Sequence, residues 1–300
     1  MEKSLPIATE HYPPSQPPAA RHGALRALLF TFLTAVLCFT WLSQPLSELL
    51  GGSDAPLKPA KESKCQQVPA LHPTDENDKV KAAFDFLFTE PFQNASITRL
   101  SDAVKVKTES FDDLGAIGED KRWDVFYGFH EYLEQTFPRI HAELKVEHVN
   151  THGLVYTWEG SDSKKKPMVV MAHQDTVPVD PDTIDSWTHP PWSGHFDGTS
   201  IWGRGASDCK NQLIGTMETL EILLDAGFKP KRTIVLSYGF DEECSGRQGA
   251  GHLAPFLLER YGENGVAAII DEGMGHANAF GREFAVPGVA EKGAICLPDS

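Results

Sequence analysis

Apolar residues recur in short periodic stretches from about residue 76 onward. Residues 168–172 (MVVMA) and 266–270 (VAAII) are continuous apolar runs, which are typical of buried strands, whereas residues 212–226 space their apolar positions as a helix does. Because strands alternate with helices, the pattern predicts an α/β fold, a three-layer, mostly parallel sheet with helices on both faces. The predicted helices are 80–88, 123–137, 212–226 and 250–261, and the predicted strands are 144–149, 154–158, 168–172, 233–239 and 266–270.

A different apolar pattern lies near the N-terminus, where residues 27–42 (ALLFTFLTAVLCFTWL) carry no charge. A helix of this length spans about 24 Å, and neighbouring residues extend it toward the ~30 Å of a hydrocarbon core. We therefore predict a transmembrane signal anchor over residues 25–43. Arg21 and Arg26 lie on the N-terminal side of the uncharged run, and the next basic residue is Lys58. The positive-inside rule then places the N-terminus in the cytosol and the rest of the chain across the membrane.

Two alternatives to the anchor are a cleaved signal peptide and a buried core helix. The long preceding segment disfavours a signal peptide, and so long an uncharged run disfavours a core helix. The anchor divides the chain into a Pro-rich cytosolic tail (1–24), a luminal stalk (44–75) and a folded part (76–300). Asn94 begins an Asn-Ala-Ser glycosylation sequon, which agrees with a luminal folded part.

Composition narrows the class of protein. The chain of 300 residues is 41% hydrophobic and 23% charged, which excludes a wholly disordered or collagen-like protein. A formal net charge of −15 argues against nucleic acid as a partner, because such binding needs a basic face. Five cysteines are too few for a disulfide scaffold. The predicted luminal part holds four of them, which allow three full disulfide pairings: Cys65, Cys209, Cys244 and Cys296. For Cys209 and Cys244, packing as small buried residues is the favoured role.

Polar side chains that can bind metal follow the predicted buried strands. Ligands of such sheets bind at the carboxyl ends of the strands, so these side chains are expected to converge. Clustered carboxylates repel one another unless a cation lies between them, and one imidazole with several carboxylates suits Zn²⁺, with Mn²⁺ or Co²⁺ as alternatives. The excess of carboxylates indicates two metals that share a bridging Asp. The residues are His173, Asp175, Asp208, Asp241, Glu242, Glu243, Asp271 and Glu272.

Four motifs carry a resemblance to a known family. They are MAHQDTVPV (171–179), IWGRGASDCKN (201–211), SYGFDEECSG (237–246) and IIDEG (269–273). Residues 80–293 resemble the aminoacylase/carboxypeptidase family of co-catalytic zinc peptidases, and within it the fungal carboxypeptidase S (Gly-X carboxypeptidase) branch.

The resemblance implies a role for each matching residue. Asp175 orients the catalytic base or His173, and Glu242 is the general base that deprotonates the metal-bound water. Asp208 bridges the two metals. The implied ligands are His173 and Asp271 on the first zinc, Glu243 on the second, and Asp208 on both.

The resemblance also implies the function and its setting. Together with the predicted anchor, it predicts a zinc metallo-carboxypeptidase that releases C-terminal residues from short peptides, as a single-pass type II membrane protein facing a vacuolar or secretory lumen. The family's dimerisation domain would begin near residue 293, and its last zinc-binding His lies beyond. Residues 76–300 are therefore expected to be the N-terminal part of the catalytic domain, and a homodimer is expected only with the dimerisation domain present.

Two other functions stay open on the sequence. The same motifs fit an N-acyl-amino-acid amidohydrolase of this family. Comparing the hydrolysis of blocked dipeptides with that of N-acetyl amino acids would decide between this activity and the carboxypeptidase. A truncated, non-catalytic membrane-tethered protein is the other alternative, which metal content would distinguish.

Overall fold

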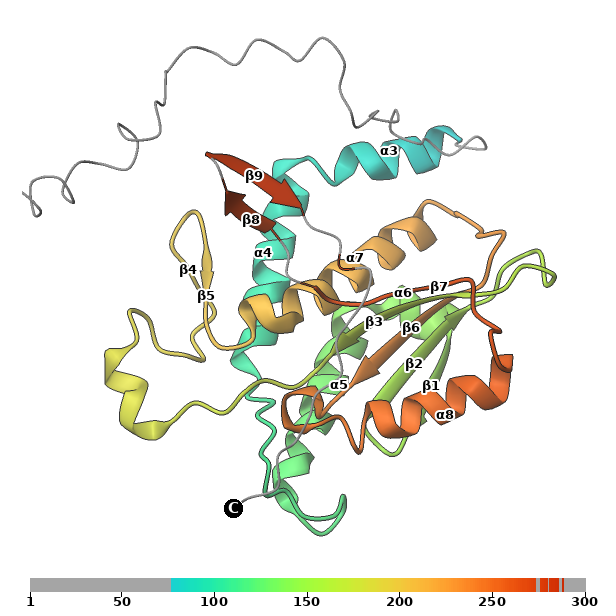
Figure 1. Cartoon of the computed structure of the whole chain (residues 1–300). Helices are drawn as coiled ribbons and strands as arrows, with labels where there is room; N and C mark the ends of the chain where they lie inside the picture. Colours follow the sequence, from blue (N-terminus) through green and yellow to red (C-terminus); the bar gives the residue numbers. More distant parts are fainter. Residues whose placement is uncertain (1–76, 274–275, 280, 286–287, 289–300) are drawn as a thin grey trace, which may run out of the picture. The chain divides into compact units, whose positions relative to one another are not determined.

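A five-stranded sheet of order β1-β2-β6-β3-β7 organises the described part of the chain (Figure 1). The computed structural model describes residues 77–273, 276–279, 281–285 and 288. The strands of this sheet are β1 (Lys145–Val149), β2 (Gly153–Trp158), β3 (Met168–His173), β6 (Ile234–Gly239) and β7 (Ala268–Ile270). Two two-stranded sheets lie outside it: β4 (His195–Phe196) with β5 (Ile201–Trp202), and β8 (His276–Ala279) with β9 (Arg282–Ala285).

The sheet is mostly parallel, as the sequence predicts, with one reversed strand. β3 pairs in parallel with β6 and β7, whereas β2 is antiparallel to both β1 and β6. The reversal follows from the short connection between β1 and β2, because a parallel pair would need a crossover of a dozen or more residues. Asn150 and Thr151 make this turn with positive φ angles of 47° and 70°.

Helices cover both faces of the sheet, which confirms the predicted three layers. Leu154 and Leu236 point to one face, where they pack with residues of α5, α6 and α7, while their neighbours Val155 and Val235 pack with Leu253 of α8 on the other. Figure 1 shows α8 and α7 on different sides of the strands. The helices are α3 (Asp78–Phe86), α4 (Glu90–Lys105), α5 (Val125–Thr136), α6 (Pro138–Glu143), α7 (Asn211–Asp225) and α8 (Ala250–Tyr261).

The long helix α4 is absent from the sequence prediction. Its sequence is mostly polar, and its buried residues are Ala103 and Val104 near its end. The helix is held by tertiary contacts instead, because Glu218 of α7 accepts hydrogen bonds from Ser96 (2.8 Å) and Arg99 (3.0 Å). Tertiary packing rather than an apolar stripe therefore specifies this element.

A buried lysine ties α4 to the start of α7. Lys210 is fully buried, and its ammonium donates hydrogen bonds to the carbonyls of Ala103 (3.0 Å) and Val106 (2.7 Å) while lying over the Phe129 ring. Burial lowers its pKa to about 7. These contacts fix the segment just before α7, which carries Asp208.

The predicted anchor over residues 25–43 lies outside the described residues, as do the predicted tail and stalk. Among the helices of the described part, none is long and apolar enough to cross a bilayer.

Candidate metal centre

The carboxyl ends of three parallel strands bring the predicted site residues to one edge of the sheet. β3 ends at His173, which pairs in register with Gly239 at the end of β6. Glu242 and Glu243 follow β6 on a short helical turn, and Glu272 follows β7. This is the edge at which open α/β sheets bind ligands.

His173 is at the centre of the cluster. Its Nε2 atom lies 3.0 Å from an Asp208 oxygen, 3.5 Å from a Glu272 oxygen and 3.9 Å from a Glu242 oxygen. Two groups of donor atoms lie mutually within 4.8 Å, namely His173 with Asp208, Cys209 and Glu272, and His173 with Glu242 and Glu243.

This donor set fits zinc. Ligand atoms of a tetrahedral zinc with bonds of about 2.0–2.1 Å lie about 3.3 Å apart, close to the distances around His173 Nε2. His173 belongs to both groups and offers one ring nitrogen to a metal, so the described residues provide an imidazole for one zinc. Asp208 belongs only to the first group. Its bridging of two metals stays a prediction.

The structure places Glu272 rather than Asp271 beside His173. Asp271 is exposed, and its Oδ1 accepts a hydrogen bond from the Glu272 backbone (2.9 Å), although both residues line one cavity of about 370 Å³ with His173 and Glu242. The sequence places two acidic residues after the same strand and does not decide between them. The predicted ligand role of Asp271 stays untested, and Glu272 is an added candidate.

Asp175 contacts both parts of the centre. It is fully buried; its Oδ1 accepts hydrogen bonds from His173 Nδ1 and the Glu242 backbone, and its Oδ2 accepts one from the Glu243 backbone, each at 3.1 Å. Because Asp175 accepts a hydrogen bond from Nδ1, Nε2 is the ring nitrogen that faces the other carboxylates, and a metal bound there would take the place of the Nε2 proton. The predicted orienting role of Asp175 therefore has contacts to both His173 and the Glu242 loop.

Electrostatics show that the cluster favours a cation. Burial first, and then the charges of neighbouring carboxylates such as Asp208, raise the pKa of Glu242, Glu243 and Glu272. Burial lowers the pKa of His173, but hydrogen bonds to Asp175 and Cys209 outweigh it and raise that pKa to about 12. A bound metal ion would relieve the same excess of negative charge.

A glycine brings the loop that carries Asp208 against the loop that carries Asp175. Gly205 has a φ of +81°, and a Cβ atom there would collide with the Thr176 side chain. Asp208 follows in the turn 206–210, which leads into α7. A side chain at Gly205 would therefore separate two loops that the centre needs together.

The two cysteines next to predicted ligands are both free thiols. Cys209 is buried, and its Sγ accepts a hydrogen bond from the His173 backbone (3.1 Å), so it packs beneath the centre as predicted. Cys65 and Cys296 lie outside the described residues. Asn94 of the sequon is exposed on α4, and its glycosylation stays a prediction.

His130, His148 and His152 form a cluster, which the sequence did not predict, beside Gln174, the residue after His173. His130 Nε2 donates to Gln174 Oε1 (2.9 Å), and Gln174 Nε2 donates to the His152 carbonyl (2.8 Å). The rings of His130 and His148 are 5.2 Å apart. Burial lowers the pKa of His130 and of His152 to about 4.

These two histidines predict an acid-sensitive fold. Because their pKa values are near 6.5 in the unfolded chain and about 4 in the folded one, the unfolded chain binds more protons between these values. Stability is thus expected to fall as pH drops from about 6.5 to 4, by on the order of 1–3 kcal/mol per histidine. Urea unfolding of wild type and His152→Phe at pH 7 and pH 4.5 measures this. An equal acid loss in both proteins would contradict the assignment to His152.

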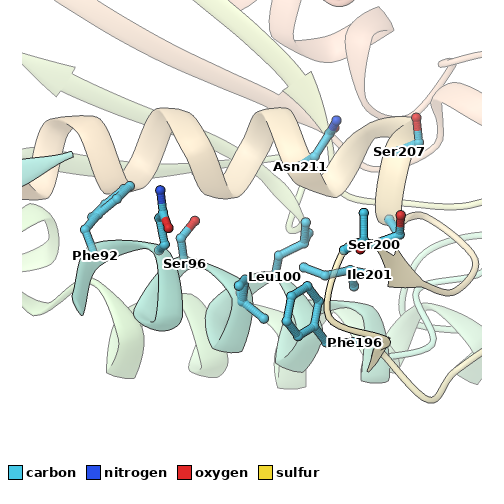
Figure 2. Close-up of a pocket in the computed structure, with 12 residues that line it drawn as sticks. Phe92, Ser96, Leu100, Phe196, Ser200, Ile201, Ser207 and Asn211 are labelled. Atoms are coloured by element: carbon cyan, nitrogen blue, oxygen red, sulfur yellow. The ribbon is translucent and has the colours of Figure 1, made fainter. Parts of the chain in front are cut away.

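A groove of about 570 Å³ lies between α4, the start of α7 and the β4–β5 hairpin. Figure 2 shows Phe92 at one end and Ser207 at the other, with Leu100, Phe196 and Ile201 along it. Ser207 directly precedes Asp208, so one end of the groove adjoins the metal centre. None of its lining residues is charged, although the chain as a whole is strongly acidic.

Comparison with known proteins agrees with this geometry. Residues 169–281 match the model of peptidase family M20/M25/M40. Carboxypeptidase S of Saccharomyces cerevisiae is 48% identical over 242 residues, which are 79% of this chain and 41% of that protein. N-fatty-acyl-amino acid synthase/hydrolase PM20D1 of Xenopus tropicalis is 32% identical over 209 residues, which are 67% of this chain and 38% of that protein.

A solved structure shares the fold. The crystal structure of human carnosine dipeptidase 1 superposes with a TM-score of 0.50 at 16% identity, over 64% of this chain and 40% of that one. The chain thus spans about two fifths of the length of each of these three proteins.

Proposed function

Because this chain belongs to peptidase family M20/M25/M40 through residues 169–281, we propose that it is the metal-binding part of a zinc metallo-carboxypeptidase that acts on short peptides. The observation that carries the proposal is the convergence of His173 Nε2 with Asp208, Glu242 and Glu272 at the strand ends. The 48% identity to a carboxypeptidase S supports the choice of carboxypeptidase.

The chain's own residues have distinct parts in this reaction. When bound, zinc lowers the pKa of its water and polarises the scissile carbonyl. Glu242 faces the same cavity as His173, and its raised pKa suits a base that accepts the water's proton and passes it to the leaving nitrogen. Asp175 holds the backbone of Glu242 and Glu243, so the base keeps its position beside the ligands.

An exchange protein tests this activity. It is the Saccharomyces cerevisiae carboxypeptidase S in which the 242 matched residues are replaced by those of this chain. We expect it to release leucine from N-blocked Gly-Leu and to lose this activity when a chelator removes the metal. Activity that survives metal removal, or its complete absence in a folded exchange protein, would contradict the proposal.

The groove favours a second candidate function, the hydrolysis of N-acyl amino acids. Its uncharged lining complements an apolar acyl chain, its volume exceeds that of one side chain, and one end adjoins Asp208. The 32% identity to an N-fatty-acyl-amino acid synthase/hydrolase supports this alternative. Rates of the exchange protein on blocked dipeptides and on N-acyl amino acids decide between the two functions.

A charge in the groove is expected to weaken the binding of a long-chain N-acyl amino acid. Phe196→Asp places a carboxylate on the groove wall, at a residue that is 38% exposed and so tolerates the change. Calorimetry should show that the Phe196→Asp variant binds the N-acyl amino acid at least about tenfold more weakly than the unaltered protein does. The reason is that the new carboxylate must lose its water beside an apolar acyl chain. Thr98→Asp, an exposed change on α4 outside the groove, is the matched control. Equal affinity of both variants would exclude the groove as the acyl site.

We further propose that the protein is membrane-anchored, glycosylated at Asn94 and luminal, and that dimers need the dimerisation domain. The uncharged run 27–42 and the exposed sequon support this setting. Treatment with an endoglycosidase should change the gel mobility of the wild-type protein but not that of Asn94→Gln. Equal mobility of the treated and untreated wild type would contradict glycosylation at Asn94.

A further inference from the structure

We propose that Ser110 is a positioning residue of the metal centre, which holds Asp175 in the orientation that aims His173 Nε2 at the metal. This inference rests on the proposed function, because it takes His173 as a zinc ligand. The Ser110 hydroxyl donates to Asp175 Oδ2 at 2.6 Å, and the two residues are 1% and 0% exposed. A buried hydrogen bond to a carboxylate is short and strong, so its loss would be felt at the carboxylate.

Ser110 differs from the other donors to Asp175 in where it is anchored. Those donors are His173 Nδ1 and the backbones of Glu242 and Glu243, which belong to the loops whose relative position Asp175 sets. They would move together with the ligands. Ser110 lies 65 residues earlier in the chain, so it gives Asp175 a contact outside both ligand-bearing loops.

The segment that carries Ser110 is itself fixed along the loop after β3. Glu109 and Thr176 form a parallel bridge, in which Ser110 N donates to the Thr176 carbonyl (3.1 Å) and Thr176 N donates to the Thr108 carbonyl (2.9 Å). Thr108 Oγ1 donates to the Gln174 carbonyl (2.6 Å). The Ser110 hydroxyl is therefore held in place by backbone pairing and is ready to orient Asp175.

A nucleophilic role for Ser110 does not fit its surroundings. Its hydroxyl is buried and is directed at a carboxylate, and it is absent from the cavity lined by His173 and Glu242. A purely structural role and a positioning role remain distinguishable, because only the second changes zinc affinity in a protein that stays folded.

The test compares zinc affinity in variants of this chain. Ser110→Ala removes the hydroxyl that contacts Asp175, and we expect zinc to bind about 10–100-fold more weakly, as is typical when outer contacts of a metal site are lost. Thr108→Val is the matched control, because it removes a neighbouring buried hydroxyl that bonds to backbone alone. Zinc dissociation constants come from competition with a chromophoric chelator, and urea midpoints report stability. If Ser110→Ala does not fold, Ser110→Cys keeps the volume with a weak donor and gives the same readout.

Each outcome decides the proposal. It is supported if Ser110→Ala binds zinc more weakly while Thr108→Val, with a comparable loss of stability, binds zinc as wild type does. It is overturned if the two variants bind zinc equally. His173→Ala separates this failure from a failure of the proposed function: if that variant loses zinc while Ser110→Ala does not, only the role of Ser110 is wrong. If His173→Ala also binds zinc as wild type does, the zinc centre itself is wrong, and the inference falls with it.

Discussion

Replacing His173 with alanine is expected to abolish tight zinc binding by this chain. His173 provides the one ring nitrogen common to both groups of donor atoms, and its Nε2 lies 3.0 Å from Asp208. Loss of an outer contact typically costs 10–100-fold in metal affinity, so loss of this inner donor should cost more. Chelator competition measures the change, with His195→Ala, an exposed histidine of β4, as the control.

The control variant should bind zinc as wild type does. If His173→Ala and His195→Ala have the same zinc affinity, the cluster at the strand ends is not the metal site. Because His173 is 2% exposed, circular dichroism of the metal-free variant must first show that it is folded.

Replacing Glu242 with glutamine is expected to remove hydrolysis but keep zinc. Glutamine has nearly the same shape but cannot accept the water's proton, and a positioned base typically contributes about 10²–10⁴-fold to the rate. The backbone of residue 242 still donates to Asp175 Oδ1, so the loop keeps its place. The measurement is the turnover of N-blocked Gly-Leu by the exchange protein and its Glu242→Gln variant.

Zinc content decides how a loss of activity is interpreted. The variant should retain zinc at the level of the unaltered exchange protein, because the glutamine side chain still offers an oxygen. Turnover within about threefold of the unaltered exchange protein would exclude Glu242 as the base, since a base contributes far more than that. Glu263→Gln, an exposed change in the loop after α8, is the matched control and should leave turnover unchanged.

Much of the sheet could be predicted from the sequence because two of its strands lie in continuous apolar runs. Residues 168–172 form β3 as predicted, whereas only three residues of the run 266–270 form β7, and these are exposed at the edge of the sheet instead of buried. Helix α4 could not be predicted in this way, because its contacts are polar. The Glu218 carboxylate that pairs with Arg99 lies 119 residues away in the chain, and such pairings leave no local pattern.

The site was predictable where strand order alone brings residues together. His173 and Glu242 follow neighbouring parallel strands, so their proximity follows from topology. The choice between Asp271 and Glu272 depends on which side chain turns inward after β7, and adjacent acidic residues give no sequence signal for that. Ser110 was also missed, because nothing local marks a serine whose partner lies 65 residues away.

The amount of zinc bound by the purified chain tests the central claim most directly. Elemental analysis after dialysis against a weak chelator counts the tightly bound ions. We expect about one zinc per chain, since the donor groups of the described residues share the single imidazole of His173. A folded chain that retains no zinc, or that retains it equally after His173→Ala, would contradict a zinc centre at His173.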